Sequence, residues 1–401
     1  MGNSSRVLVA GPLGGFAEGF VAELAGLGYA PGSHEKQLGL MRHLSSWLGD
    51  RGLSAGDLSG EVLAAFVADR RERSADLCSP RALVVLLGFL RREGVAPALA
   101  AVVPDGPVEV VLERFARYLF TQRGLATATV RSYVSQSRPF LSLHVDDQGG
   151  WSSVGAGDVA EFVTDSAVRL RPRSVATMVR ALRSLLRWMW TEGMLSVALA
   201  ETVGSVATPS GGPPRALSDR EICDLLAALG AEGPARRRNE AMMALMWRLG
   251  LRAGEVATLR LADIDWSAGV ITVRGKGDRR ERLPLPVDVG ELLVGYLRDA
   301  RPRGSAHREV FLAVAAPHRP LRSPAVTSVA ARALARAGIT GPGAAHRLRH
   351  TAACRVLAGG GGLVEVGQLL RHASASATLI YAKSDLKALA MLARPWPGAS
   401  R

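Results

Sequence analysis

Six side chains near the end of this 401-residue chain have the types needed to cleave a phosphodiester. They are two guanidinium groups, one ammonium group, two imidazoles and one phenol: Arg252, Arg349, Lys276, His346, His372 and Tyr381. A phosphodiester gathers negative charge on its non-bridging oxygens as a nucleophile attacks. Planar guanidinium groups match those oxygens in pairs and stay ionised at neutral pH. Fixed donors aimed at developing charge usually supply the largest catalytic contribution.

Tyr381 and Lys276 are the candidates for nucleophile and proton donor. A phenol is almost fully protonated at neutral pH, so it needs nearby cations and a base before it can attack. Lys276 is one of four lysines beside 46 arginines, and an ammonium group can release a proton where a guanidinium cannot. The alternatives are a packed tyrosine with a hydrogen-bonded hydroxyl and a solvated lysine in the Gly275–Asp278 turn.

Three sequence blocks around these residues resemble the tyrosine recombinases of the phage integrase family. They are Gly250–Asp265 (GLRAGEVATLRLADID), His346–His350 (HRLRH) and Leu370–Tyr381 (LRHASASATLIY). The blocks follow one another in the family's order across residues 216–385, and a weaker resemblance extends to about residue 106. Tyr381 lies nine residues after His372, as the third block requires.

The resemblance implies a role for each residue of the set. Arg252 and Arg349 would clamp the scissile phosphate, and Lys276 would protonate the departing 5′ oxygen. His346 would exchange a proton with Tyr381.

Two further roles follow from the same blocks. His372 would donate a hydrogen bond to the phosphate, and Glu255 would orient a neighbouring basic group. A solvated helix glutamate is the alternative for Glu255.

Two residues of these blocks require separate interpretation. His346 and His350 form an H-x-x-x-H pair, but Arg347 stands where a metalloprotease has Glu and Arg349 would repel a dication. We therefore expect no metal site and interpret His350 as a structural histidine that braces the turn. Arg371 replaces the glycine usual before the family's histidine, and we expect it either to contact the DNA backbone or to alter the turn.

The resemblance implies a site-specific recombinase or integrase that forms a 3′-phosphotyrosyl intermediate without metal, ATP or other cofactor. Its partners would be a double-stranded DNA recombination site and further copies of the chain, as a dimer on one site and a tetramer in the synapse. Accessory proteins and a role in transposition of a mobile element are compatible with it. The alternatives are a DNA-relaxing enzyme like the type IB topoisomerases and an inactive DNA-binding accessory protein.

The overall composition agrees with a nucleic-acid partner. The net charge is +14 and the sequence pI about 10.7, which favours a polyanion. The three cysteines lie far apart with no metal-ligand spacing, and no apolar run or leader pattern predicts membrane insertion or export. We therefore expect a cytoplasmic protein.

Proline and glycine clusters predict the domain organisation of a mainly α fold with a small antiparallel sheet. We expect an N-terminal helical arm (1–105), a helical core-binding domain of SAM-like type (106–207), a linker (208–215) and the catalytic domain (216–401). Helices are predicted at 112–122, 127–143, 158–167, 174–192, 218–229, 238–249 and 255–261. Strands are predicted at 270–273 and 282–285, flanking Lys276.

The helix predicted at 174–192 carries Arg180, Arg183 and Arg187 on one face, which suits contact with a DNA backbone or a solvated surface.

Residues 16–100 resemble a diverged copy of the helical domain. Phe66-Val67 matches Phe162-Val163 and Trp47 falls opposite Leu143 at an offset of 96, while Glu93-Gly94 matches Glu192-Gly193 at an offset of 99. Shared helical periodicity is the alternative explanation. A second arm of this kind would contact DNA or a neighbouring subunit.

Overall fold

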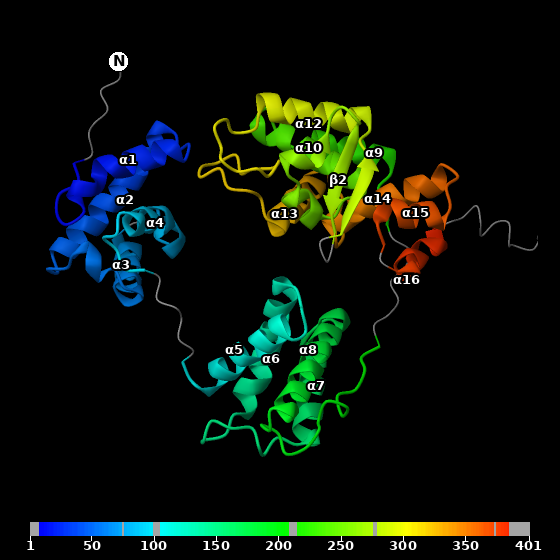
Figure 1. Cartoon of the computed structure of the whole chain (residues 1–401), viewed down its shortest axis with the longest axis horizontal. Coiled ribbons are helices and arrows are strands. Elements are labelled where there is room, and N and C mark those ends of the chain that lie inside the picture. Colours follow the sequence, from blue (N-terminus) through cyan, green and yellow to red (C-terminus); the bar gives the residue numbers. More distant parts are fainter. Residues whose placement is uncertain are drawn as a thin grey trace, which may run out of the picture. The chain divides into compact units, whose positions relative to one another are not determined.

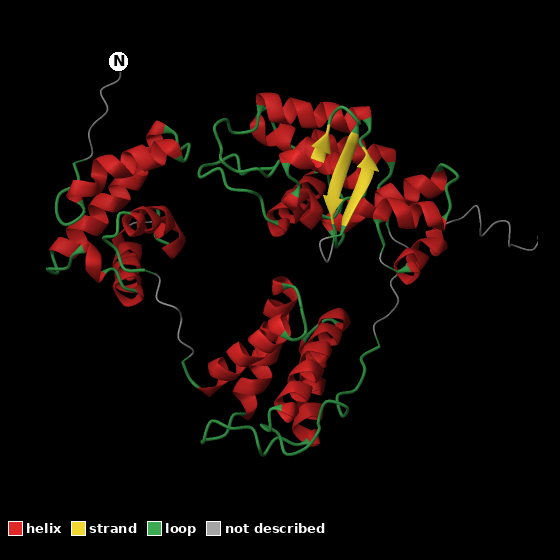
Figure 2. Ribbon diagram, viewed as in Figure 1, coloured by secondary structure: helices red, strands yellow, loops and turns green. Residues whose placement is uncertain are grey.

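The computed structural model describes residues 8–73, 76–98, 105–207, 215–275, 279–372 and 374–384. Helices make up most of this part of the chain, and its strands lie between residues 264 and 284 (Figures 1 and 2). Leu99–Gly211 forms one compact unit and the remainder of the chain a second. Short 3-10 helices lie between or beside the longer elements: Gly14–Phe16, Ala55–Asp57, Pro80–Leu83, Leu261–Asp263 and Leu379–Ser384 (η5). The predicted fold class, mainly α with a small antiparallel sheet, is confirmed.

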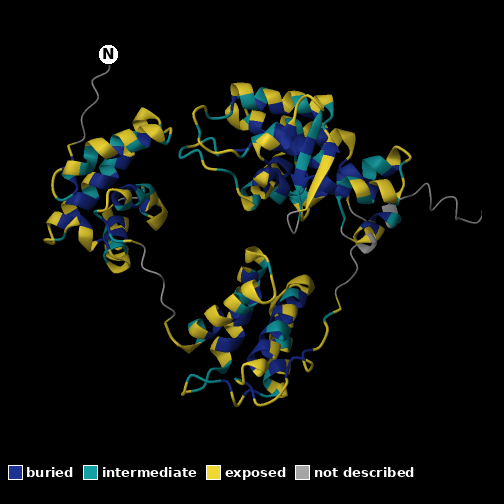
Figure 3. Cartoon of the chain, viewed as in Figure 1, coloured by how far each residue is buried: buried dark blue, intermediate teal, exposed yellow. Residues whose placement is uncertain are grey.

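The helical domain of residues 105–207 contains four helices around one hydrophobic core. They are α5 (Pro107–Thr121), α6 (Thr127–His144), α7 (Ala156–Arg169) and α8 (Pro172–Thr191), close to the predicted ranges. α8 starts two residues earlier than expected because Pro172 fits the first turn, where no backbone N–H is needed. Apolar side chains alternate with exposed arginines along α8, so one face enters the core (Figure 3).

Four helices also build the N-terminal segment: α1 (Ala17–Gly26), α2 (Pro31–Gly49), α3 (Gly60–Arg73) and α4 (Val84–Arg92). Their core is formed by residues of this segment. α2 and α3 begin 96 residues before α6 and α7, and α4 ends 99 residues before α8.

The matched positions of these two segments agree in some places and differ in one. Phe66 and Phe162 are both buried, and Gly94 and Gly193 both follow a helix with positive φ. Trp47 and Leu143, which fall opposite each other at the same offset, differ in burial, since Trp47 is 5% exposed and Leu143 is 67% exposed.

The C-terminal segment is built from helices around a three-stranded antiparallel sheet. The strands are β1 (Ile264–Asp265), β2 (Val270–Arg274) and β3 (Arg280–Pro284), in the order β1-β2-β3 with Ile271 opposite Leu283. The helices are α9 (Asp219–Ala227), α10 (Pro234–Arg248), α11 (Ala253–Thr258), α12 (Val287–Asp299), α13 (Ser323–Arg336), α14 (Ala344–Ala358), α15 (Leu363–Leu370) and α16 (Ala375–Thr378). The predicted hairpin is confirmed in its two strands, whereas Lys276 at its turn lies outside the described residues.

Hydrogen-bonded caps fix where the first helices of this segment begin and end. Ser218 and Glu221 form the capping box predicted at the start of α9. After α10, Gly250 has φ +62°, a left-handed conformation that favours glycine. A Cβ at Gly250 would approach Leu370 Cδ2 to 2.6 Å, so the absent side chain also admits the end of α15.

Two hydrophobic clusters support this segment. The larger one runs from α9 through the sheet to α14 and includes the buried Tyr296. A smaller cluster joins α14, α15 and η5 through Ala353, Leu357, Val366, Leu370 and Tyr381. The second cluster therefore holds the segment that carries Tyr381 against α14. No helix of the described residues is long and apolar enough to cross a membrane.

Thr351 of α14 should stabilise this arrangement measurably. Its fully buried hydroxyl accepts a hydrogen bond from the Leu217 N–H at 2.9 Å and donates to the Arg347 carbonyl. Thr351→Val has a similar shape but leaves a buried N–H unpaired, so we expect a loss of about 1–3 kcal/mol in the free energy of unfolding in urea. Thr351→Ser keeps the hydroxyl and is the control. Equal stabilities of the two variants would contradict this role.

Candidate active site

The start of α11 places Arg252 at the centre of the site. Gly250 ends the preceding turn and Arg252 is the N-cap of α11, with extended backbone, as its position just beyond a helix terminus predicted. Glu255 accepts hydrogen bonds from the Arg252 backbone N–H at 2.8 Å and from its Nη1 at 2.7 Å. The Arg252 side chain is 41% exposed, so it is held at its base while part of its guanidinium reaches solvent.

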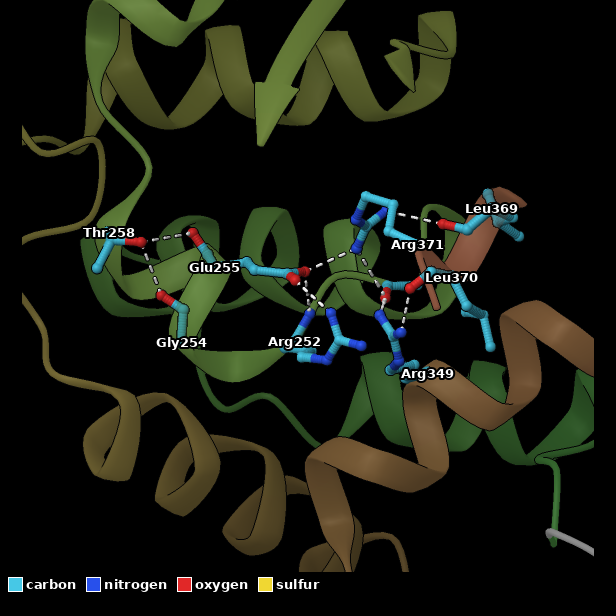
Figure 4. Close-up of polar contacts among 9 residues, drawn as sticks. Arg252, Gly254, Glu255, Thr258, Arg349, Leu369, Leu370 and Arg371 are labelled. Atoms are coloured by element: carbon cyan, nitrogen blue, oxygen red, sulfur yellow. Dashed lines mark hydrogen bonds and ion pairs between the residues drawn. The ribbon is translucent and has the colours of Figure 1, made fainter. Parts of the chain in front are cut away.

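Glu255 also holds a second arginine, and this contact is buried. Arg371 Nη2 donates to Glu255 Oε2 at 2.7 Å, and the two side chains are 3% and 5% exposed. Figure 4 shows the Glu255 carboxylate between Arg252 and Arg371. Burial alone would raise the pKa of Glu255, but the charge of Arg371 and the hydrogen bonds from Arg252 outweigh it and hold the pKa below its ordinary value.

Arg349 lies on α14 and is tied to two backbone carbonyls. Its Nη1 donates to the Gly250 carbonyl and its Nη2 to the Leu370 carbonyl at the end of α15 (Figure 4). Burial, with a smaller effect of the nearby Arg252 charge, lowers the pKa of Arg349 to about 10. The guanidinium therefore remains charged at neutral pH while it joins the ends of α10 and α15.

A cavity of about 1310 Å³ opens over these arginines. Its lining is rich in basic and imidazole side chains: Arg252, Arg260, Arg274, Arg279, His346, Arg349, Arg371 and His372, together with Gly275 and the carboxylates of Glu255 and Glu281. The structure thus brings together four of the six candidate residues, since Arg252, His346, Arg349 and His372 share one cavity. Lys276 directly follows Gly275 in sequence but lies outside the described residues.

Tyr381 lies in η5, beneath this cavity rather than on its wall. Its side chain is 1% exposed, and its hydroxyl is 2.5 Å from His350 Nδ1. Burial raises the pKa of Tyr381 to about 12, although the charge of Arg349 lowers it in part. Burial and the charge of His346 lower the pKa of His350 to about 4. At neutral pH both groups are uncharged, so the phenol can donate its proton to His350 Nδ1.

This contact differs from the expectation for the two histidines of α14. His350 was predicted only to brace the turn, yet it is the histidine that bonds the Tyr381 hydroxyl. His346, predicted to exchange the proton, lines the cavity instead, with its ring centroid 6.3 Å from that of His350. The one-turn spacing predicted both positions but not which imidazole faces inward.

His372 is oriented by a residue that sequence reasoning missed. Its Nδ1 lies 2.7 Å from the hydroxyl of Thr378, which is 7% exposed, and the His372 ring stacks near Tyr381 at 6.2 Å between centroids. Burial and the charge of Arg349 lower the pKa of His372 to about 4. A neutral ring with Nδ1 engaged leaves Nε2 to act toward a phosphate. The position of Thr378, three residues before Tyr381, is the sequence feature that could have indicated this contact with His372.

The arginines expected to contact DNA differ in their surroundings. Arg180 is exposed on α8, and Arg187 is exposed and paired with Glu201. Arg183 instead donates from Nε and Nη2 to the Val203 carbonyl, so it ties the following loop to α8. Arg371 is turned into the protein toward Glu255. No group of three or more His, Cys, Asp or Glu among the described residues could hold a metal ion.

Comparisons with known proteins match both parts of this architecture. The model of the phage integrase family matches residues 215–387, and that of the phage integrase N-terminal SAM-like domain matches residues 112–193. A putative integrase/recombinase of Sinorhizobium fredii, y4rA, is 38% identical over 396 residues, 98% of this chain and 96% of the relative. Tyrosine recombinase XerD of Mycobacterium tuberculosis is 32% identical over 306 residues, 72% of this chain and 96% of the relative.

Solved structures share the fold. XerH site-specific recombinase in a post-cleavage complex with its palindromic difH substrate has a TM-score of 0.57 at 18% identity, covering 74% of this chain and 98% of that one. A lambda integrase dimer bound to a COC′ core site has a TM-score of 0.55 at 17% identity, covering 73% and 98%.

The half-buried His350 should make stability depend on pH. The unfolded chain binds a proton on this imidazole near pH 6.5, whereas the folded chain resists protonation until about pH 4. The unfolded state therefore binds more protons between these values, so the free energy of unfolding decreases as the pH falls from 6.5 to 4. We expect His350→Gln to show a shallower dependence in urea unfolding across this window. His307→Gln removes an exposed imidazole and is the control; identical slopes for wild type and His350→Gln would contradict the burial effect.

Proposed function

The chain belongs to the phage integrase family of tyrosine recombinases, and we propose that Tyr381 is the residue with which it cuts and rejoins DNA. The observation that carries this proposal is the contact between the Tyr381 hydroxyl and His350, on the same helix that carries Arg349. A phenol, a proton acceptor and fixed cations are the parts that phosphodiester cleavage requires.

The reaction proceeds in two balanced steps. The Tyr381 oxygen attacks the scissile phosphorus as its proton leaves to a histidine, and the bond to the 5′ oxygen breaks. Lys276 supplies a proton to that 5′ oxygen. A 5′ hydroxyl of a partner strand then attacks the 3′-phosphotyrosyl phosphorus and loses its proton to Lys276, while the histidine returns a proton to the departing Tyr381 oxygen. The bond energy is conserved in the covalent intermediate, so the route needs neither metal ion nor nucleotide.

The cavity divides the other roles among its lining residues. Arg252 and Arg349 stabilise the charge on the non-bridging oxygens, and His372, oriented by Thr378, donates a hydrogen bond from Nε2. His346 also lines this cavity and exchanges protons with groups around the bound phosphate. Burial keeps the phenol protonated, and His350 receives its proton when attack begins.

Tyr381 must move relative to the cavity before it can reach a phosphate held there. The phenol is 1% exposed and lies in the small cluster beneath the arginines. Leu370 and Arg371, at the end of α15, are held by Arg349 and Glu255, so a displacement that preserves the site must involve the residues after them. We propose that DNA binding displaces the segment around η5 while the end of α15 stays in place, and that this brings the hydroxyl to the phosphate.

The positive charge of the chain is concentrated where the cleavage is proposed. Residues 215–401 contain 29 Lys and Arg against 16 Asp and Glu, whereas residues 8–98 contain nine against ten. We propose that the catalytic domain, together with Arg180 and Arg187 of α8, contacts the DNA backbone. A dimer on one site and a tetramer in the synapse follow from the need to exchange strands between two duplexes. We also propose action on a mobile element in the cytoplasm, which the similarity to a putative integrase/recombinase supports.

We further propose the domain boundaries 1–105, 106–207, 208–215 and 216–401, with the first domain a diverged copy of the second. The repeated helix positions and the common burial of Phe66 and Phe162 support the copy. The copy has Glu35 where α6 has Arg131, and Gly88 where α8 has Arg187. A helical unit that lacks these basic groups suits contact with a neighbouring subunit better than contact with DNA.

Covalent trapping tests the proposed nucleophile. A pool of nicked duplexes with randomised sequence selects the bound sites, and a nick beside the scissile bond lets the short product diffuse away. We expect wild-type protein to become attached to a selected duplex and Tyr381→Phe to bind it without attachment, as seen by denaturing electrophoresis. Tyr296→Phe, at a buried tyrosine of the larger core, controls for the loss of a hydroxyl. Attachment by Tyr381→Phe would exclude Tyr381 as the nucleophile.

Plasmid relaxation separates recombination from the topoisomerase alternative. We expect wild-type protein to relax supercoiled plasmids only when they carry a selected site, because the reaction is coupled to a specific synapse. Two such sites on one plasmid should also yield deletion or inversion products. Rapid relaxation of a plasmid without a site, with no product from two sites, would support the topoisomerase.

A further inference from the structure

Arg371 occupies a backbone conformation that its side chain does not favour. Its φ and ψ are both 53°, the left-handed region, at the C-cap of α15. A residue with a Cβ costs about 1–2 kcal/mol there, whereas glycine adopts the conformation freely. An arginine at this position therefore needs a compensating contribution from its side chain.

The side chain supplies three interactions inside the site. Its Nη1 donates to the Leu369 carbonyl at 2.8 Å, and its Nη2 donates to Glu255 at 2.7 Å and to the Gly250 carbonyl at 3.4 Å. Figure 4 shows the guanidinium between the end of α15 and the carboxylate of α11. The carbonyls at a helix C-terminus lack partners within the helix, so a cation there is favourable.

We propose that Arg371 is a positioning residue for cleavage, which acts by sharing Glu255 with Arg252. This inference rests on the proposed roles of Arg252 and Tyr381. With one buried carboxylate between two guanidinium groups, Glu255 can hold Arg252 in place without neutralising the cavity. The same contacts fix the end of α15, and hence His372, against the turn that carries Arg252.

The charges around the carboxylate explain why both arginines are needed. Arg252 presents part of its guanidinium to solvent, and its remaining donors are available to a phosphate only if Glu255 keeps its base fixed. A lone Glu255–Arg252 pair would offset the positive charge that a phosphate requires. Arg371 restores one positive charge and is itself too buried, at 3% exposure, to bind the phosphate in place of Arg252.

Matched variants test this role in single-turnover cleavage of a selected nicked duplex. We expect Arg371→Gln to lower the cleavage rate about 10- to 100-fold, the size of effect that a small misplacement of a reacting group produces, with little change in the Kd for the same duplex. Arg371→Lys keeps the positive charge but not the paired N–H donors of the guanidinium, so it should recover part of the rate. Arg298→Gln removes an arginine that pairs with Asp299 on α12 and should cleave like wild type.

Three further measurements distinguish positioning from a purely structural role. Arg371→Gly removes the side chain and relieves the backbone strain, so a loss of rate in this variant cannot be attributed to a strained fold. Loss of Arg371 should also shift the acidic limb of the pH–rate profile to higher pH, because Glu255 loses the neighbouring charge that favours its ionised form. In a Glu255→Gln background, Arg371→Gln should have little additional effect.

The outcomes separate this inference from the proposed function. If wild-type protein forms no covalent complex through Tyr381, the proposed function fails. If wild type forms the complex and Arg371→Gly cleaves at the wild-type rate with an unchanged pH profile, only the positioning role is overturned. Additive losses in the Glu255→Gln background would overturn it as well.

Discussion

The buried carboxylate of Glu255 is the interaction on which the rest of this site depends. It receives the backbone and side chain of Arg252 from one side and the guanidinium of Arg371 from the other. Buried charges are stable only when they are paired and hydrogen-bonded, and here one anion satisfies two cations. Removing the carboxylate would leave two guanidinium groups facing each other, so the active-site turn and the end of α15 share one electrostatic support.

Backbone carbonyls connect this support to the nucleophile segment. Arg349 and Arg371 both donate to the carbonyl of Gly250, and each donates to a carbonyl at the end of α15. The helix that carries His346 and the segment that carries Tyr381 are therefore joined through side chains whose charge would also stabilise the phosphate in the proposed mechanism. The same few guanidinium groups therefore hold the backbone segments together and supply the positive charge of the site.

Much of this arrangement follows from the sequence because it is local. The capping box at Ser218, the turn at Gly250 and the one-turn spacing of His346 and Arg349 each have a physical signature within a few residues. The helices from α5 to α11 and the two hairpin strands were accordingly predicted within about five residues of their observed bounds, whereas no bounds were predicted for α1–α4 or for the helices after β3.

The long-range contacts could not be predicted in the same way. Arg371 was expected either to contact the DNA backbone or to alter the turn, and its buried contact with Glu255, 116 residues away, had no local signal. Likewise, His350 rather than His346 meets Tyr381, because helical spacing gives the angle between two side chains but not which one the next segment covers. Trp47 and Leu143, paired by their sequence offset, differ in burial for a related reason, since the offset does not indicate which side of a helix packs into the core.

The burial of Tyr381 has a consequence for the enzyme away from its target. A phenol that is hidden from water and stays uncharged up to about pH 12 offers no nucleophile to the small phosphate esters that fill a cell. In the proposed mechanism, the chain would therefore present a reactive phenol only after this aromatic ring has been uncovered at a bound target.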